Sequence, residues 1–174
     1  MTQPAVIREA VPQDAKALSA LGRETFTLEF GYLYTAQNLA GFLDTTYTPD
    51  LLQREIAAPD TRMTVAEQGG RLVGYAASGP CKLPVPDMPP QAYELRRIYL
   101  IPEAKGQRLG SALLADALRF FRDRNASAVY VGVWSENVRA QAFYRKAGFE
   151  KVGEYHFMVG TQADDEWIMR LTGW

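Results

Sequence analysis

The feature that most constrains the fold is a strand-like segment, a glycine-bearing turn and a helical segment that follow one another directly. Residues 93–101 are rich in bulky β-forming side chains and end at Pro102, and residues 111–124 carry apolar side chains at helical spacing. Gly106 and Gly110 lie in the turn between them. A strand that leads through a tight turn into a helix is typical of domains that mix the two elements in layers.

The rest of the chain adds strands and helices with no linker long enough to separate domains. Gly69 and Gly70 sit between two β-forming segments, which predicts an antiparallel hairpin, and the prolines of residues 82–90 predict a surface loop. We expect one domain over residues 1–174. Its predicted strands are residues 6–10, 63–67, 72–77, 93–101, 128–134, 153–159 and 166–171, and its predicted helices start at Pro12 and Thr48 and cover 37–43, 111–124 and 138–146.

Composition excludes several classes of partner. The 174 residues are 47% hydrophobic and carry 19 basic against 20 acidic side chains, a net charge of -1. This balance gives no reason to expect nucleic acid or an anionic membrane as a partner. The single cysteine, Cys81, and an N-terminus without signal-peptide character favour the cytoplasm. No apolar run approaches the roughly 20 residues that span a bilayer.

The turn at residues 103–110 has the composition of an anion site. A helix N-terminus presents unpaired backbone N–H groups, and glycine lets a ligand approach the main chain closely. Lys105 and Arg108 add positive charge. The spacing is neither the dinucleotide fingerprint nor a P-loop. By itself it leaves two interpretations open, a diphosphate cradle or two glycines that only shape the turn.

Two motifs in the same order resemble the signatures of one enzyme family. Gln107, Gly110 and Ala112 fill the fixed positions of Q/R-x-x-G-x-G/A, and residues 137–149 match N-x-x-A-x-x-F-Y-x-K-x-G-F. With these motifs the chain resembles the GNAT acetyltransferases, apart from Arg108, where the family commonly has glycine. The resemblance implies an α/β (α+β) GNAT fold, with a mixed, mostly antiparallel central sheet flanked by helices. Its strands would splay between Ile98 and Val131 to form the acetyl-CoA cleft.

A narrower resemblance concerns residues 131–140. They are similar to a bacterial branch of the family that includes polyamine N-acetyltransferases of the PaiA kind. In that branch the C-terminal tail usually carries a histidine, a glutamine and an aspartate at the places that here hold Tyr155, Asp164 and Glu166. Residues 131–140 therefore match the branch, whereas the C-terminal tail differs from it.

The family resemblance also implies a set of coenzyme-binding residues. The backbone of Ile98, Tyr99 and Leu100 would pair with the pantetheine arm, as a strand added to a sheet edge would. The diphosphate would lie on the amides that follow, and the helix near residue 140 would line the other side. The remaining implied positions are Lys105, Gly106, Gln107, Arg108, Leu109, Gly110, Ser111, Asn137, Arg139, Tyr144 and Lys146.

Tyr144 and Glu94 are the candidate catalytic residues. Tyr144 matches the general acid of the family, which would protonate a departing thiolate whose thiol has a pKa of about 8.5. Glu94 would accept the amine's proton directly or through water, because freeing an alkylamine at neutral pH costs about 4 to 5 kcal/mol. The plainer alternatives are that Tyr144 is a packed aromatic and that Glu94 is a salt-bridged strand carboxylate.

The acceptor wall is expected from the first two helices and their connection, where aromatic and acidic side chains suit a cationic amine. The same residues could instead form core or a lid. The only histidine, His156, is predicted to be structural, and Cys81 has no activating partner, so we expect neither a metal site nor a covalent acyl-cysteine. The candidate substrate-binding residues are Phe26, Glu29, Phe30, Tyr32, Tyr34 and Tyr47.

These observations predict an N-acetyltransferase that moves an acetyl group from acetyl-CoA to a primary amine of a small molecule by direct attack. Polyamines are one candidate acceptor class. The alternatives are a protein or peptide N-acetyltransferase and a non-catalytic acyl-CoA sensor. We expect a monomer or homodimer that needs no metal, nucleic acid or membrane.

Overall fold

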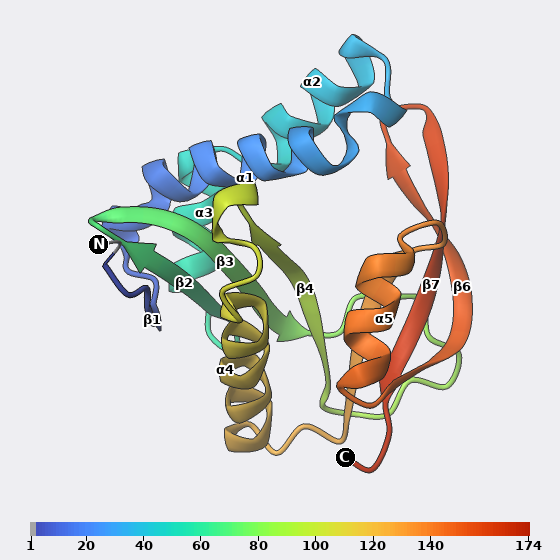
Figure 1. Ribbon diagram of the computed structural model, residues 1–174. Helices are drawn as coiled ribbons and strands as arrows, with labels where there is room; N and C mark the ends of the chain where they lie inside the picture. Colours follow the sequence, from blue (N-terminus) through green and yellow to red (C-terminus); the bar gives the residue numbers. More distant parts are fainter. Residues whose placement is uncertain (1–2) are drawn as a thin grey trace.

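The computed structural model describes residues 3–174, and within them seven strands form one open sheet (Figure 1). The strand order is β1-β2-β3-β4-β5-β7-β6, and only the β4–β5 pair is parallel. The predicted mixed and mostly antiparallel sheet is thus confirmed. The strands are β1 (Val6–Glu9), β2 (Arg62–Gln68), β3 (Arg71–Pro80), β4 (Ala92–Leu100), β5 (Ala128–Trp134), β6 (Phe149–Val159) and β7 (Gln162–Leu171).

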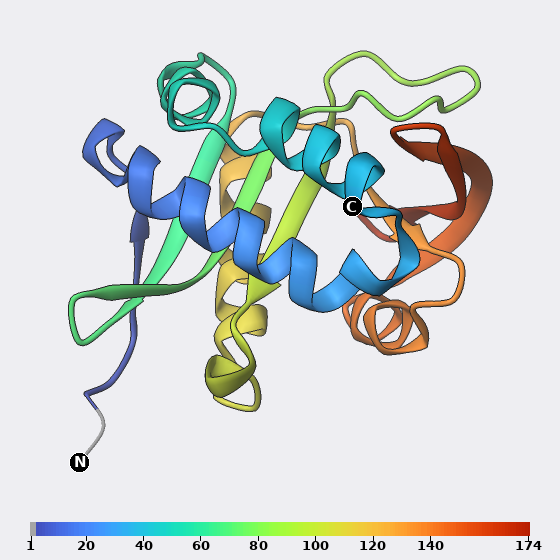
Figure 2. The ribbon, with the colours of Figure 1, turned by 90° about the horizontal axis from the view of Figure 1, so that it is seen from above.

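Helices cover both faces of the sheet. Figure 2 shows α1 (Ala15–Phe30) running across the strands, with α2 (Ala36–Thr46) and α3 (Pro49–Ala57) beside it. The helices α4 (Leu109–Asp123) and α5 (Val138–Lys146) lie on the opposite face. Short 3-10 turns are η1 (Pro12–Asp14), η2 (Gly31–Leu33) and η3 (Pro102–Ala104).

Local sequence explains where several elements start and stop. Thr35 and Thr48 accept hydrogen bonds from the N–H groups of the first turns of α2 and α3, as N-cap residues do. Gly69 and Gly70 both have positive φ, which permits the tight β2–β3 turn. Gly148, with φ of +99°, ends α5 and leads directly into β6.

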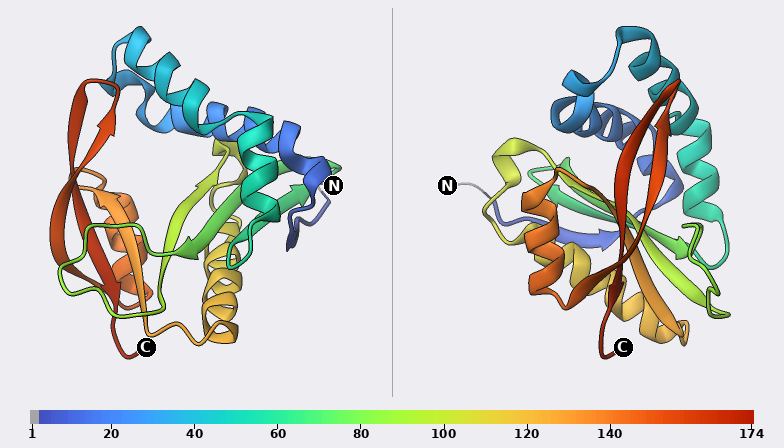
Figure 3. Two further views of the ribbon diagram at one scale, coloured as in Figure 1. Left: turned by 180° about the vertical axis from the view of Figure 1, so that it is seen from behind. Right: turned by 90° about the vertical axis from the view of Figure 1, so that its right-hand side faces the viewer.

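The β6–β7 hairpin is longer than the sequence pattern predicted. Its strands start at Phe149 and Gln162 rather than near residues 153 and 166. Most side chains of β6 are exposed or half-buried, so the start of that strand carries little hydrophobic signal. Backbone pairing with β7 extends it, and Figure 3 shows the twisted hairpin rising to the level of α2.

Two cores meet the two faces of the sheet. The first packs α1, α2 and α3 on the β1–β3 half, and the second packs α4 and α5 against β4, β5 and β7. Leu18, Tyr47 and Val65 are buried in the first core, while Leu113, Phe121 and Met169 are buried in the second. Among residues 3–174, no helix has both the length and the apolar character that a bilayer crossing requires.

The sheet splits where its parallel pair ends. β4 and β5 pair from Ala92 with Ala128 to Leu95 with Val131, after which each strand continues without the other. The register between β3 and β4 shifts at Arg96, so Leu95 and Ile98 both pack toward α4 while Tyr99 packs toward α1. The predicted splay between the strands of Ile98 and Val131 is therefore present.

Candidate active site

The splay opens into a cleft of about 680 Å³ that is lined from both faces of the sheet. We call its α4–α5 side the turn half, lined by Lys105, Gly106, Arg108, Leu109, Gly110, Ser111, Asn137, Arg139, Ala140, Phe143 and Tyr144. We call its α1 side the hairpin half, lined by Thr25, Phe26, Glu29, Phe30, Tyr34, Phe42, Thr46, Tyr47, Glu94, Arg96, Arg97, Trp134, Tyr155, Phe157, Asp164 and Glu166. Ile98, Tyr99 and Leu100 of β4 run between the two halves.

The turn half is an anion cradle made of main chain. The first hydrogen bond inside α4 is donated by Ala112 N–H to the Arg108 carbonyl, at 3.1 Å, so the amides of residues 109–111 point out of the helix end. Gly106 has φ of +83°, and a Cβ placed there would meet no atom within 4 Å. The backbone of this turn is therefore open to a phosphate-bearing ligand.

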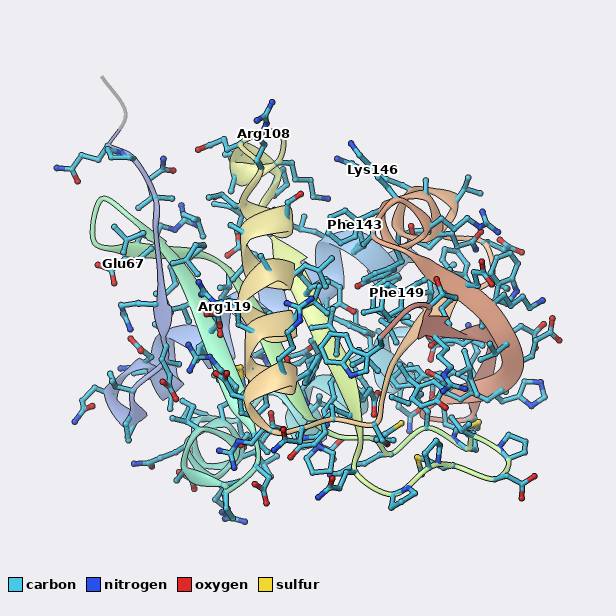
Figure 4. The ribbon with its side chains drawn as sticks, turned by 90° about the horizontal axis from the view of Figure 1, so that it is seen from below. Glu67, Arg108, Arg119, Phe143, Lys146 and Phe149 are labelled. Carbon is cyan, nitrogen blue, oxygen red and sulfur yellow. The ribbon has the colours of Figure 1, made fainter. Side chains whose placement is uncertain are left out.

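Arg108 replaces the glycine common at its position without changing the turn. It adopts the left-handed conformation, with φ of +61°, as the residue that precedes α4. A non-glycine residue in this region costs about 1 kcal/mol. Figure 4 shows its side chain pointing away from the end of α4.

Several predicted coenzyme-binding side chains have other partners. Gln107 does not line the cleft; its amide donates to the Glu103 carbonyl at 3.0 Å and accepts a hydrogen bond from Gln68. Asn137 lines the cleft but also caps α5 through Ala140 N–H. Lys146 points outward from α5, as Figure 4 shows, and is absent from the lining.

One ion pair joins a predicted coenzyme residue to a predicted acceptor residue. Lys105 Nζ lies 2.9 Å from a carboxylate oxygen of Glu29, which ties the turn before α4 to α1. Tyr32, another predicted acceptor residue, is 74% exposed and does not line the cleft. The other predicted acceptor residues, Phe26, Glu29, Phe30, Tyr34 and Tyr47, all line the cleft.

Tyr144 of α5 lines the turn half of the cleft. Its side chain is 6% exposed, and its ring packs against Phe143 and Phe149 with centroid distances of 5.2 and 5.6 Å. Burial raises the pKa of Tyr144 above its usual value, so the hydroxyl stays protonated at neutral pH. The side chain is a packed aromatic whose protonated hydroxyl belongs to a residue that lines the cleft.

Glu94 is a buried carboxylate of β4 in the hairpin half. One of its oxygens accepts a hydrogen bond from Lys82 N–H at 2.9 Å. Burial raises the pKa of Glu94, although this hydrogen bond and the charge of Arg96 oppose that change. It has no ion pair within the part of the chain that the structure describes.

Two further carboxylates in the hairpin half were not predicted as site residues. Asp164 accepts a hydrogen bond from the Tyr34 hydroxyl at 2.5 Å, and Glu166 accepts one from the Tyr155 hydroxyl at 2.6 Å. Burial raises the pKa of Glu166 to about 7, and the charges of Asp164 and Glu94 act in the same direction. The only sequence signal for these residues was that the tail departs from the PaiA-like pattern.

Aromatic rings line the rest of the hairpin half. Phe26 contacts Phe42, Phe30 and Tyr34 with centroid distances of 4.5, 5.2 and 6.0 Å, and it is almost fully buried. Phe30 also meets Trp134 of β5 edge to face at 6.2 Å. Tyr47 is buried below them, so the predicted acceptor aromatics belong to the core and to the cleft wall at once.

Two arginines of β4 were also missed by sequence reasoning. Arg97 is held by Glu55 through two hydrogen bonds of 3.0 Å, and its guanidinium lies over the Tyr47 ring. Arg96 donates to the Pro80 carbonyl at 2.9 Å. Arg97 is therefore neutralised by an ion pair, whereas Arg96 forms none among residues 3–174.

His156 and Cys81 lie outside the cleft. His156 is on the exposed side of β6, 3.0 Å from an oxygen of Asp165. Burial raises the pKa of Cys81 to about 11, which makes its thiol a poor nucleophile at neutral pH. In residues 3–174, no three His, Cys, Asp or Glu side chains gather as metal ligands would.

Comparison with known proteins gives a consistent picture. Residues 27–149 match the Acetyltransferase (GNAT) family. An uncharacterized N-acetyltransferase of Lactobacillus delbrueckii subsp. lactis is 29% identical over 91% of each chain. The N-alpha-acetyltransferase RimI of Mycobacterium tuberculosis is 35% identical over 73% of this chain and 76% of its own. The crystal structure of PaiA N-acetyltransferase from Thermoplasma acidophilum in complex with coenzyme A superposes with a TM-score of 0.78, at 21% identity, over 97% of this chain and 99% of that one.

Proposed function

Because the chain belongs to the GNAT acetyltransferase family, and is therefore an acetyl-CoA-dependent N-acyltransferase, we propose that it acetylates a primary amine of a small cationic molecule. Polyamines are the first acceptor class to test. The observation that carries this proposal is one cleft with an exposed main-chain turn on one side and, on the other, three carboxylates that form no ion pair among residues 3–174, namely Glu94, Asp164 and Glu166.

The turn half fits the coenzyme. The free amides of residues 109–111 and the open space at Gly106 suit a diphosphate. The edge of β4 from Ile98 to Leu100 has no strand partner on the β5 side, so its backbone is free to hold an extended pantetheine arm. Acetyl-CoA supplies the thioester that the amine attacks.

Tyr144 is proposed to protonate the leaving thiolate. It lines the cleft, and its raised pKa keeps the proton in place until a strong base forms beside it. Phe143 and Phe149 fix its ring, so little conformational freedom remains to be lost during the reaction.

The hairpin half suits a cationic acceptor. Carboxylates and aromatic ring faces both attract an alkylammonium, and this wall contains both. Glu94 supports the proposal as a carboxyl group of fixed orientation, because the Lys82 N–H donates a hydrogen bond to one of its oxygens.

Contacts above the hairpin half favour a small acceptor over a peptide. The Tyr34 hydroxyl bonds Asp164, and Asn38 of α2 bonds both the hydroxyl and the N–H of Thr161, at 3.3 Å each. These contacts join the α1–α2 connection to the tip of the β6–β7 hairpin, as the views in Figure 3 suggest. A peptide that entered the cleft from this side would have to break these hydrogen bonds.

A thiol-release assay tests the acceptor class. Purified protein and acetyl-CoA are incubated with putrescine, spermidine, amino acids, aminoglycosides and alanine-started peptides. We expect the polyamines to give the highest kcat/KM. Faster turnover of a peptide would replace this acceptor class and would agree with the name of the RimI relative, an N-alpha-acetyltransferase. Coenzyme binding without thiol release from any amine would indicate a sensor instead.

The cell compartment is a separate proposal. The free thiol of Cys81 is half-buried and has no cysteine partner in the sequence. A reducing cytoplasm suits such a chain.

A further inference from the structure

Three side chains from three adjacent strands form a row on the α1 side of the splay. Glu166 of β7 is directly opposite Trp134 of β5 and Tyr155 of β6 in the strand register. All three line the cleft, and the Tyr155 hydroxyl donates to the Glu166 carboxylate at 2.6 Å. The hydroxyl and the carboxylate form a pair that points into the hairpin half.

A glycine inside β5 makes room for this pair. A Cβ on Gly132 would lie 2.3 Å from the Tyr155 hydroxyl oxygen and 3.3 Å from the nearer Glu166 oxygen. Glycine weakens a strand interior, so its presence here indicates a close approach by another group. Gly132 follows Val131, which makes the last pairing with β4, so the Tyr155–Glu166 pair lies where the splay begins.

Glu166 faces groups from every wall of the hairpin half. Asp164 neighbours it on β7 and Glu94 approaches from β4, and both negative charges act on it. Burial is the main reason that the pKa values of Tyr99 on β4 and Tyr34 beside α1 are raised, and the charge of Glu166 adds to both. Glu166 therefore acts on residues of β4 and of the α1–α2 connection, and all of these residues line the cleft.

Glu94 is less free to receive a proton than Glu166. The Lys82 N–H that bonds a Glu94 oxygen favours the ionised form and holds it toward the loop after β3. The protein partner of Glu166 is a tyrosine hydroxyl that itself lines the cleft. Of the two glutamates, Glu166 is therefore the one presented to a ligand.

We propose that Glu166, oriented by Tyr155, takes a proton from the acceptor ammonium, while Glu94 attracts the positively charged acceptor into the cleft. This inference rests on the proposed function. An N–H bond of the ammonium breaks and the proton moves to the Glu166 carboxylate. The freed lone pair forms the C–N bond, the C–S bond breaks, and the thiolate takes the Tyr144 proton. The acylated nitrogen then loses a second proton to the Tyr144 phenolate, and Glu166 releases its proton to solvent.

The pH dependence follows from the ionisation of Glu166. Because burial places its pKa at about 7, the proton-accepting carboxylate is the minor form below that pH and the major form above it. The kcat/KM of the wild-type protein should therefore rise through an inflection near pH 7. The acceptor amine, with a pKa of about 10.4, supplies its own free base only at much higher pH.

Glu166→Gln tests the role directly. With a diamine acceptor at pH 7.5, kcat/KM should fall about 100-fold, and the inflection near pH 7 should disappear. The defect should shrink below about fivefold at pH 9.5, because the free amine no longer needs the carboxylate. Acetyl-CoA affinity should stay within about twofold, since the turn half is untouched.

Asp165→Asn is the matched control. Asp165 is the adjacent residue of β7, but it is exposed on the other face and does not line the cleft. This variant should keep the wild-type pH profile. The proposal would be overturned if Glu166→Gln lowered kcat/KM equally at every pH or did not lower it. It would also be overturned if Glu94→Gln lost the inflection near pH 7 while Glu166→Gln kept it.

Tyr155→Phe tests the positioning role. The Tyr155 hydrogen bond lowers the pKa of Glu166, so removing it should move the inflection to higher pH. An unchanged inflection would show that Tyr155 does not act on the base. If the wild-type protein releases no thiol with any amine, the proposed function fails. If the wild-type protein releases thiol and Glu166→Gln has the same activity and pH profile, the function stands and this inference alone fails.

Discussion

The two halves of the cleft are built in different ways. The turn half comes mainly from one short stretch of backbone, residues 105–111, whose geometry is set by glycine, a left-handed Arg108 and a helix N-terminus. The hairpin half comes from side chains of α1, α2, β4, β5, β6 and β7. A main-chain site tolerates changes of side chain, whereas a side-chain site changes its chemistry with each substitution. The difference explains how one coenzyme site can serve many acceptors.

Of the changes that follow, Tyr144→Phe should have the largest effect on turnover, because it removes the proposed proton donor. Turnover should fall about tenfold or more, since the proton donor is lost, while acetyl-CoA affinity changes less than about twofold. Steady-state kinetics and calorimetry measure the two quantities. Tyr93→Phe is the matched control, because Tyr93 is buried against α4 outside the cleft. Unchanged turnover in Tyr144→Phe would rule out the acid role.

Asp164→Asn should alter the hairpin half alone. It removes a carboxylate that faces the acceptor and weakens its link to Tyr34, so the KM for a diamine should rise about fivefold to tenfold. The KM for acetyl-CoA should stay within about twofold. An equal rise in both KM values would mean that the halves are not independent.

Glu166→Gln should also change how stability depends on pH. A carboxyl whose pKa is raised on folding binds more protons in the folded state, so wild-type stability should fall as pH rises from about 4.5 to about 7. The full shift would correspond to about 3 kcal/mol, and partial exposure should reduce the observed difference to about 1 to 2 kcal/mol. Urea unfolding at pH 5 and pH 8 measures it. The variant should lack this decrease, and an identical decrease in both proteins would assign it to another group.

Arg108→Gly should have the smallest effect. If backbone amides hold the diphosphate, exchanging this side chain for glycine should lower acetyl-CoA affinity by less than about threefold. Glycine also adopts the left-handed conformation without strain. Titration with acetyl-CoA at two salt concentrations checks this. A loss of tenfold or more would mean that the guanidinium, rather than the main chain, carries the binding.

Local sequence patterns predicted the parts of the fold whose causes are local. The turn glycines, the Thr48 cap and the Gly69–Gly70 hairpin all act on neighbouring backbone, and the structure contains each of them. The start of β6 at Phe149 was missed because pairing with β7, rather than its own side chains, makes it a strand.

Motif matching does not specify side-chain direction. Gln107 and Lys146 occupy motif positions, yet Gln107 bonds Glu103 and Gln68 while Lys146 points to solvent. Their proposed coenzyme contacts stay predictions. Phe143, which was not predicted, lies 3.8 Å from the position a Gly110 Cβ would take and so packs against the turn.

The sequence by itself determined the family, the sheet class and the glycine-bearing turn before α4, because short motifs fix backbone conformation over a few residues. Only the tertiary structure decided which carboxylates line the cleft and which tyrosines bond them. Tyr34 and Asp164 lie 130 positions apart, and strand register alone brings Tyr155 and Glu166 together beside Gly132. A one-residue shift in that register would turn the Tyr155–Glu166 pair to the other face, so the acceptor site depends on the assembled sheet.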